Sequence, residues 1–269
     1  MTTLRSRISD VGKELWANFR PAKEAVLSLR EVGLRRRAEF QRLRKSPEYQ
    51  AVYDNPEPLV SILIATYNRA QLLRDRSLRS CLEQTYSNIE VIVVGDCCTD
   101  DTAAIMAEVD DTRVRFVNLP ERGNYPADPY LRYLVAGTKP VNQALALARG
   151  DFITHLDDDD EHAPDRTQEL LECIREKRSD LVFHPFRCEL PDGQWLVNEA
   201  EKFHCGRVTT SSIFYHRHFR SLPWDPLAWR LGEPGDWNRL RKIKFMGAKV
   251  QRDSGIHLAH YREQNQAKP

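Results

Sequence analysis

The chain has 269 residues, of which 41% are hydrophobic and 29% charged, a composition that is ordinary for a globular protein. Its net charge of +1 gives no reason to expect a nucleic-acid partner, and no apolar run is long enough to span a bilayer. The six cysteines lack paired C-x-x-C spacing, and the N-terminus lacks the apolar stretch of a secretory signal. We therefore expect a cytoplasmic protein without a zinc or disulfide framework.

Residues 1–45 form a basic segment with twelve Lys or Arg against five Asp or Glu. Apolar residues recur there at partly helical spacing, which predicts one or two amphipathic helices with a break or a first turn at Pro21. Two roles stay open: packing on the rest of the protein or on a dimer partner, and peripheral contact with anionic lipid at the inner face of the membrane.

The stretch 46–58 is rich in proline and turn-forming residues and predicts a linker. We therefore divide the chain into a helical extension with its linker at 1–57 and a second domain at 58–269. Because every motif described below follows residue 59, we expect the extension to be dispensable for chemistry.

From residue 59 onward, predicted strands and helices alternate. Buried, mostly β-branched or apolar strands are expected at 59–66, 89–96, 114–119, 152–156 and 180–186. Helices are expected at 70–84, 100–108, 138–149 and 164–177. This alternation predicts an α/β protein with a mostly parallel sheet covered by helices on both faces. After Cys188 the elements become shorter and richer in aromatic residues, as expected of a region that shapes a pocket.

Polar residues follow three of these strands, at 66–68, at 95–96 and, most notably, at Asp157–Asp160. Four adjacent carboxylates repel one another unless a cation lies among them, and hard cations such as Mg²⁺ and Mn²⁺ prefer oxygen ligands. Open α/β sheets bind ligands at the carboxyl ends of their strands. Because no glycine-rich phosphate loop is present, we expect a nucleotide diphosphate held through a metal. A solvated acidic loop is the alternative.

Four segments resemble the bacterial-type family 2 glycosyltransferases of the GT-A fold. They are VSILIATYNR (60–69), QTYSNIEVIVVGDCCTDDT (84–102), NQALALARGDFITHLDDDDEHAPDR (142–166) and GEPGDW (232–237), in family order and at family spacing. The resemblance implies a mostly parallel central sheet flanked by helices. It also implies inverting transfer of a sugar from a nucleotide-diphosphate donor, with a UDP-sugar favoured, to a hydroxyl of a glycan, lipid-linked or other acceptor.

The resemblance implies a donor-side role for several residues. Ala65 and Tyr67 match the first-strand positions that hold the nucleobase, with Tyr67 similar to a stacking platform. Asp96 matches an acid that hydrogen-bonds the base. Lys139 resembles the basic residue, three places before the family's asparagine, that contacts base or phosphate. Arg132 is a rival for this role because the intervening loop is longer here.

The same resemblance implies which residues bind the metal and which one is the catalytic base. Asp157-Asp158-Asp159 matches the D-x-D motif, in which the last acid binds Mn²⁺ or Mg²⁺ and the preceding acids hold the ribose. His260 resembles the C-terminal histidine that is a further metal ligand, and it is a better match than His257. Asp236 matches the base carboxylate and Glu233 is the reserve, while a helix cap is the structural alternative for Asp236.

The chain departs from the family at Gly95, where a second Asp is common, and at Cys97-Cys98, where Gly-Ser is common. The first departure leaves the identity of the nucleotide base open. Three other functions are considered: a metal-dependent nucleotidyltransferase, a calcium-binding module and a noncatalytic nucleotide-sugar binding protein. The first lacks its glycine-rich, basic loop after the first strand. The second has His162 where an EF-hand loop requires glycine.

Overall fold

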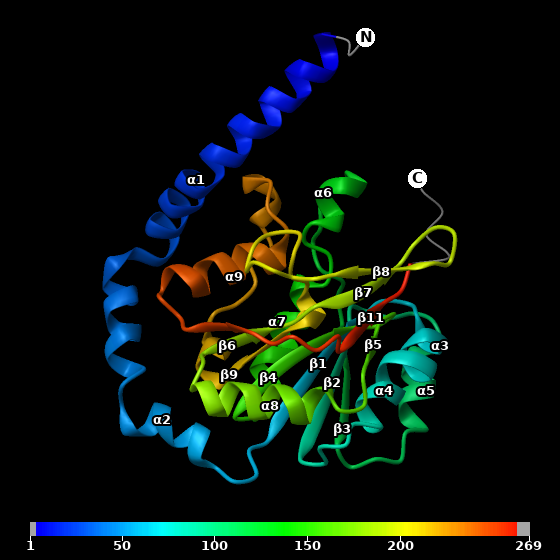
Figure 1. Ribbon diagram of the computed structural model, residues 1–269. Helices are drawn as coiled ribbons and strands as arrows, with labels where there is room; N and C mark the ends of the chain where they lie inside the picture. Colours follow the sequence, from blue (N-terminus) through cyan, green and yellow to red (C-terminus); the bar gives the residue numbers. More distant parts are fainter. Residues whose placement is uncertain (1–3, 263–269) are drawn as a thin grey trace.

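A computed structural model describes the backbone of residues 4–262 and the side chains of residues 20–262. Within this part of the chain the large sheet has the strand order β10-β6-β9-β4-β1-β2-β3 (Figure 1). Its strands are β1 (Val60–Thr66), β2 (Ile89–Gly95), β3 (Val114–Asn118), β4 (Phe152–Asp157), β6 (Leu181–Phe183), β9 (Ile213–His216) and β10 (Val250–Arg252). Only β9 runs antiparallel to its neighbours, so the predicted, mostly parallel sheet is confirmed.

The centre of the sheet is apolar because helices cover it. Ile62 on β1, Val91 on β2 and Ile153 on β4 have no exposed surface, as expected for parallel strands that are buried on both faces. The covering helices include α7 (Thr138–Leu147), which contacts β1 and β2, and α8 (Arg166–Lys177), which contacts β6. The crossover from β1 to β2 is formed by α3 (Ala70–Leu72), a π-helical segment η1 (Leu73–Leu78) and α4 (Arg79–Leu82); α5 (Thr102–Ala107) leads from β2 to β3.

A second, smaller sheet has the order β5-β11-β7-β8, with β5 (Glu161–His162), β7 (Phe186–Glu189), β8 (Trp195–Asn198) and β11 (Leu258–His260). The single strand predicted at 180–186 is wrong, because the segment is divided into β6 and β7. Pro185 explains the division, since it has no N–H to donate to a sheet ladder. The small sheet brings the C-terminal strand β11 next to β5, which directly follows the acidic residues.

Helix α1 (Leu4–Leu43) is kinked at Gly33, and its N-terminal part extends away from the body of the molecule (Figure 1). The break expected at Pro21 is wrong, because Pro21 lies inside the helix. Gly33 has a φ of 74°, which glycine adopts at little cost. The predicted linker at 46–58 is also wrong, because α2 (Pro47–Asp54) starts there, with the Ser46 hydroxyl accepting from the amide of Tyr49 at 3.2 Å.

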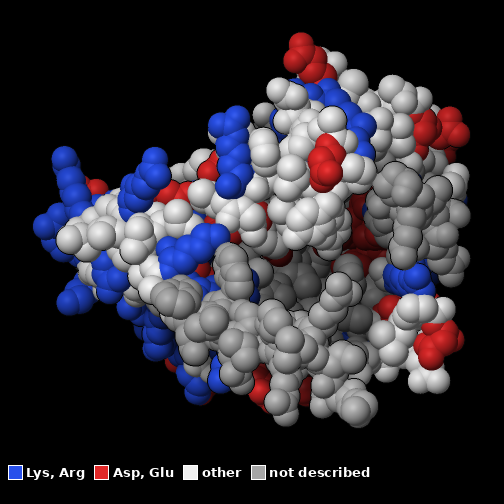
Figure 2. Space-filling view, turned by 90° about the horizontal axis from the view of Figure 1, so that it is seen from above, with Lys and Arg blue, Asp and Glu red and all other residues white. Residues whose placement is uncertain are grey.

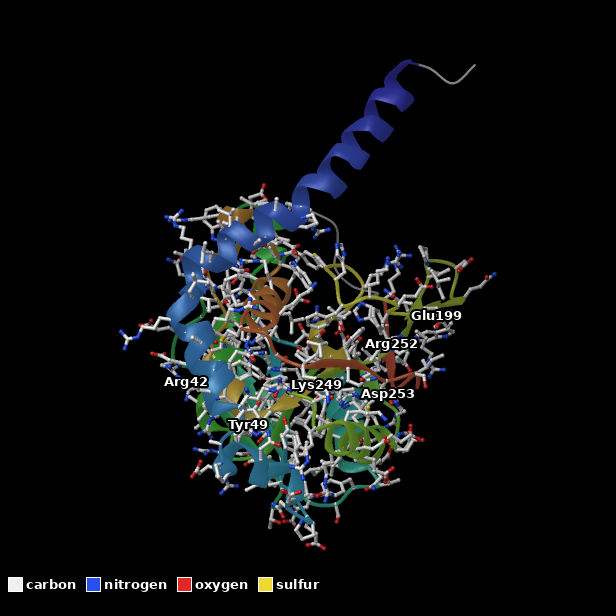
Figure 3. The ribbon with its side chains drawn as sticks, turned by 60° about the vertical axis from the view of Figure 1, so that its left-hand side comes forward. Arg42, Tyr49, Glu199, Lys249, Arg252 and Asp253 are labelled. Carbon is white, nitrogen blue, oxygen red and sulfur yellow. The ribbon has the colours of Figure 1, made fainter. Side chains whose placement is uncertain are left out.

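Helices α1 and α2 share the core of the sheet. Their buried side chains in that core, each at most 9% exposed, are Val32, Phe40, Tyr49, Val52 and Tyr53. The Tyr49 hydroxyl donates to Oδ1 of the buried Asp180 at 2.7 Å, and Arg44 pairs with Oδ2 at 2.8 Å. Figure 3 shows Tyr49 and Lys249 on the same side of the molecule, and the Lys249 amide donates to the same carboxylate. The domain division at residue 57 stays a prediction, but the two parts pack together.

The remaining elements are a short helix after β3, and 3₁₀ turns and a last helix in the C-terminal part of the chain. They are α6 (Pro129–Tyr133), the 3₁₀ turns η2 (Thr210–Ser212), η3 (Arg217–Ser221) and η4 (Ala228–Leu231), and α9 (Gly235–Phe245). Helix α9 packs against α1. Among the described residues, the helices are too short or too polar to cross a membrane.

Candidate active site

The strand ends that carry polar residues meet at one edge of the large sheet. Ala65 on β1 is paired with Asp157 on one side, and the next residue, Thr66, is paired with Gly95 on the other. The predicted juxtaposition of these strand ends is therefore confirmed. Figure 2 views the molecule from above and shows a hollow with acidic side chains at its depth.

Two arginines that follow β1 hold the acidic residues Asp157–Asp160. One nitrogen of Arg69, Nη1, donates to Oδ1 of Asp158 and to Oδ2 of Asp159, both at 2.9 Å. Arg76 donates to the backbone carbonyl of Asp159 at 2.6 Å. These contacts offset part of the repulsion among the carboxylates. Sequence reasoning did not single out either arginine, although Arg69 closes the first family segment.

The fourth acid, Asp160, is fully buried and holds the C-terminal strand. Its Oδ2 accepts from Nδ1 of His260 at 2.8 Å, and its Oδ1 accepts from the amide of Tyr261 at 3.1 Å. Burial, Asp160 and Asp159 raise the pKa of Asp157. The hydrogen bond to Asp160 raises the pKa of His260 in turn. Both shifts mean that this group of acids is stabilised by added positive charge, whether a proton or a cation.

A divalent metal fits this set of donors when a diphosphate shares its coordination. Among residues 20–262, no three carboxylate, imidazole or thiol groups are already arranged to hold a metal by themselves. His260 nevertheless has the geometry of a ligand, because a carboxylate fixes its Nδ1 and leaves Nε2 for coordination. Mg²⁺ commonly takes only one or two carboxylates and completes its shell with phosphate and water. Asp159, whose Oδ2 also pairs with Arg69 at 2.9 Å, and His260 stay the predicted protein ligands.

The predicted nucleobase position lies under the loop that follows β3. Asp96 is buried, with Oδ1 accepting from the amide of Gly123 at 2.9 Å and Oδ2 from the Tyr125 hydroxyl at 2.7 Å. The guanidinium of Arg122 lies 3.6 Å above the ring centre of Tyr67, and its Nε is 3.9 Å from Oδ2 of Asp96. A planar cation thus occupies the ring face on which a base was predicted to stack. Sequence reasoning missed both Arg122 and Tyr125.

The two rival basic residues lie in different surroundings. Lys139, at the start of α7, donates to the carbonyl of Glu121 at 2.8 Å and to that of Arg122 at 3.4 Å. It therefore holds the loop that covers Asp96. Arg132 lies on α6 instead and is half-buried. The structure brings Lys139 to the nucleobase side, and the choice between the two stays a prediction.

Asn118 gives a physical reason for the departure at Gly95. A Cβ at position 95 would lie 2.5 Å from Oδ1 of Asn118 and 3.0 Å from Sγ of Cys98. The Asn118 side chain uses this space to accept from the amide of Cys98 at 2.8 Å and to donate to its carbonyl at 2.9 Å. An aspartate at position 95 would therefore displace the asparagine that fixes the loop. Cys97 and Cys98 are free thiols.

The two candidate bases differ in how their oxygens are used. Glu233 accepts from Arg241 at 2.9 and 2.8 Å and from Asn238 at 2.9 Å, so both of its oxygens are engaged. Asp236, in the first turn of α9, accepts through Oδ1 from the amide of Trp237 at 2.6 Å. Burial raises the pKa of Asp236 to about 6. The geometry therefore favours Asp236 over Glu233 as a proton acceptor.

Tyr133 lies near the turn that carries Asp236. Tyr133, at the end of α6, is 78% exposed to solvent. Its pKa is raised by the surrounding protein and then by the carboxylates of Asp236, Asp157 and Asp159. The carbonyl of the next residue, Leu134, accepts from the amide of Gly235 at 2.7 Å, so α6 ends next to the turn that carries the candidate base. His257 belongs elsewhere, since it is buried and its Nε2 lies 2.8 Å from Asp253.

A mostly parallel sheet with acidic residues at the end of a central strand is the architecture expected of a GT-A glycosyltransferase. The family Glycosyl transferase family 2 matches residues 61–127 and 138–229, more than half of the chain. The chain therefore belongs to this family, as predicted. Hyaluronan synthase from Pasteurella multocida is 31% identical over 202 residues, which cover 72% of this chain and 19% of that protein. The chain thus spans about a fifth of the length of this relative.

Solved structures show the same fold. S. aureus TarS 1–349 in complex with UDP-GlcNAc matches with a TM-score of 0.60 and 18% identity, over 77% of this chain and 59% of that one. The mannosyltransferase PcManGT from Pyrobaculum calidifontis in complex with GDP-Man and Mn²⁺ has a TM-score of 0.55 and 19% identity, over 92% and 69%. The predicted GT-A fold is confirmed.

Proposed function

We propose that the protein is a metal-dependent, inverting glycosyltransferase. It moves a sugar from a nucleotide-diphosphate donor, with a UDP-sugar favoured, to a hydroxyl of a glycan, lipid-linked or other acceptor. The observation that carries this proposal is the strand register, which brings the ends of β1, β2 and β4, and with them Asp96 and the acidic residues Asp157–Asp160, to one edge of the sheet. The family membership of the chain supports it.

The donor is held by residues on three strand ends. Tyr67 and Ala65 receive the nucleobase, Asp96 hydrogen-bonds it, and Lys139 or Arg132 contacts base or phosphate. Asp157 and Asp158 hold the ribose. Asp159 with His260 would hold Mn²⁺ or Mg²⁺, which would supply positive charge to the diphosphate. The UDP-GlcNAc complex of the structural relative TarS supports a UDP-sugar, while the GDP-Man complex of PcManGT keeps the base open.

Asp236 receives the proton of the acceptor hydroxyl. As the new bond forms between the acceptor oxygen and the anomeric carbon, the bond from that carbon to the diphosphate breaks, and the nucleoside diphosphate leaves with the electron pair. A pKa of about 6 keeps Asp236 ionised at neutral pH and close to the operating pH, where general bases act best. Its position in the first turn of α9 also places it at the positive end of the helix dipole.

A pair of carboxamide variants tests the assignment of the base. Donor hydrolysis, followed as UDP release from UDP-sugars with Mn²⁺, needs only water as acceptor. Asp236→Asn should lower this rate by about 10²- to 10⁴-fold, the usual range for losing a general base, with UDP affinity unchanged. Glu233→Gln should chiefly lower the melting temperature, because it weakens the ion pair with Arg241. A reversed pattern would assign the base to Glu233.

The wild-type protein provides the test of the function itself. Hydrolysis of a UDP-sugar or of GDP-mannose that requires Mn²⁺ or Mg²⁺ is the expected result. Tight binding of these donors without any release of nucleotide would instead indicate a noncatalytic nucleotide-sugar binding protein. Release of pyrophosphate from a nucleoside triphosphate, with a sugar phosphate as the second substrate, would indicate a nucleotidyltransferase.

The basic segment 1–45 carries a separate prediction about location. On α1 the large apolar side chains of Val26, Leu29 and Leu34 are 46–66% exposed, next to Arg30 and Arg35. Figure 2 shows Lys and Arg gathered on the left side of the molecule. Peripheral contact with an anionic membrane inside the cell, or dimerisation, stays our expectation for this segment. Salt-sensitive cosedimentation with phosphatidylglycerol vesicles, but not with phosphatidylcholine vesicles, tests the first.

A further inference from the structure

The segment 128–137 is not part of the ranges that match the family. It begins with α6, whose Asp128 caps the helix by accepting from the amide of Leu131 at 2.9 Å. It ends at Gly137, whose φ of 79° turns the chain into α7. Figure 1 shows α6 projecting from the upper part of the molecule, next to the segment that precedes α9. The segment therefore connects the two matched ranges.

The segment is fixed against the turn that carries the candidate base. Leu134 and Val135 are 7% and 1% exposed and form a small apolar cluster with Ala228, separate from the main core. The carbonyl of Leu134 accepts from the amide of Gly235 at 2.7 Å, and Gly235 directly precedes Asp236. This anchoring holds α6 at one wall of the cleft without using its tyrosines.

Two tyrosines of α6 are free of this anchoring. Tyr133 is 78% exposed and Tyr130 is 68% exposed. Tyr133 directly precedes Leu134, whose carbonyl accepts from the amide of Gly235, so the exposed ring belongs to the residue next to the turn that carries Asp236. An exposed aromatic ring beside the candidate base is a surface on which an acceptor can bind, since its face is apolar and its hydroxyl can still form hydrogen bonds.

We propose that the segment 128–137 forms the acceptor subsite and that the Tyr133 ring is the platform on which a saccharide acceptor stacks. This proposal rests on the proposed function and adds the chemical class of the acceptor. A pyranose has a face of C–H groups that matches an aromatic ring, and hydroxyls at its edge that can reach the phenol. Because the adjoining turn carries the carboxylate of Asp236, an acyl chain is not favoured there, and the geometry points to a sugar hydroxyl rather than to a lipid alcohol.

Transfer to synthetic glycosides tests this proposal. The probes are the octyl β-glycosides of glucose, galactose and N-acetylglucosamine, supplied with the nucleotide sugar that the wild type hydrolyses. The wild type should glycosylate at least one of them. Tyr133→Ala should raise KM for that glycoside about tenfold, the scale of an aromatic stacking contact, with unchanged UDP affinity and melting temperature. Tyr133→Phe and Tyr133→Trp should keep KM within about threefold, because both retain a ring.

Tyr130→Ala is the matched control, since it removes the same side chain from the same helix one turn earlier; it should change KM less than about threefold. An unchanged KM in Tyr133→Ala, or an equal rise in Tyr130→Ala, would overturn the platform. Donor hydrolysis without transfer to any of the three glycosides would overturn the saccharide subsite while leaving the proposed function in place. Absence of any metal-dependent donor hydrolysis would overturn both.

Discussion

Removal of residues 1–54 should prevent folding, because α1 and α2 complete the core. Phe40, Tyr49, Val52 and Tyr53 are only 2–4% exposed. Loss of a buried aromatic side chain costs about 3–5 kcal/mol and loss of a buried valine about 2 kcal/mol, so the four together account for more than about 10 kcal/mol. A whole domain is stable by about 5–15 kcal/mol. The buried Asp180 carboxylate would also lose the Tyr49 hydroxyl.

Size-exclusion chromatography and thermal unfolding of a chain starting at Asn55 test this reasoning. We expect aggregation or no cooperative transition, contrary to the dispensable extension predicted from sequence. In the full chain, Phe40→Ala should lower Tm by about 10 °C, whereas Leu34→Ala, at a position that is 65% exposed, should change it by less than about 2 °C. A monomeric truncated chain that unfolds cooperatively within a few degrees of the full chain would refute the argument.

Three further outcomes concern the cleft. Asp159→Asn should abolish Mn²⁺-dependent binding of UDP, measured by calorimetry. It should not lower the stability of the free protein, because it removes one of several carboxylates that repel one another. Binding of UDP as tight as in the wild type would contradict the metal assignment. Donor hydrolysis should fall about tenfold per pH unit below about pH 6, because the raised pKa of Asp236 means that its ionised form is lost sooner on acidification. A flat pH profile down to pH 4.5 would exclude Asp236. Arg122→Ala should tighten UDP binding about two- to fivefold, since a base must displace the guanidinium from the Tyr67 ring at a cost of about 0.5–1 kcal/mol. Weaker binding would show that Arg122 contacts the nucleotide.

The sequence predicts the centre of the fold well because buried parallel strands are continuous apolar runs. The strands at 60–66, 89–95 and 152–157 were predicted to within one residue at each end. Strands β9, β10 and β11 were missed, since three or four residues are too few to show a periodicity. Their partners are far away in the sequence, so only tertiary packing identifies them.

The residues of the candidate site also divide into those that the sequence predicts and those that only tertiary packing brings together. Residues at strand ends, such as Asp96 and Asp157, could be placed together from sequence because the register of parallel strands brings their ends to one edge. Arg122 and Tyr125 lie on a loop whose path depends on hydrogen bonds to Asp96, and no local pattern encodes that path. Glu233 is likewise hydrogen-bonded by Arg241, and the packing of α9 positions this arginine. No local sequence pattern therefore predicts that the oxygens of Glu233 are occupied.

The contact between α1 and α9 connects the N-terminal segment to the chemistry. The indole of Trp237, the residue after Asp236, donates to Glu24 on α1 at 2.9 Å. One turn later, Arg241 pairs with both Glu31 on α1 at 2.6 Å and Glu233 at 2.8 Å. Such buried ion pairs add little net stability, but their geometry permits few alternative orientations of the helix. Helix α1 therefore fixes the orientation of the first turn of α9, so this part of the basic segment helps to position Asp236, the candidate base.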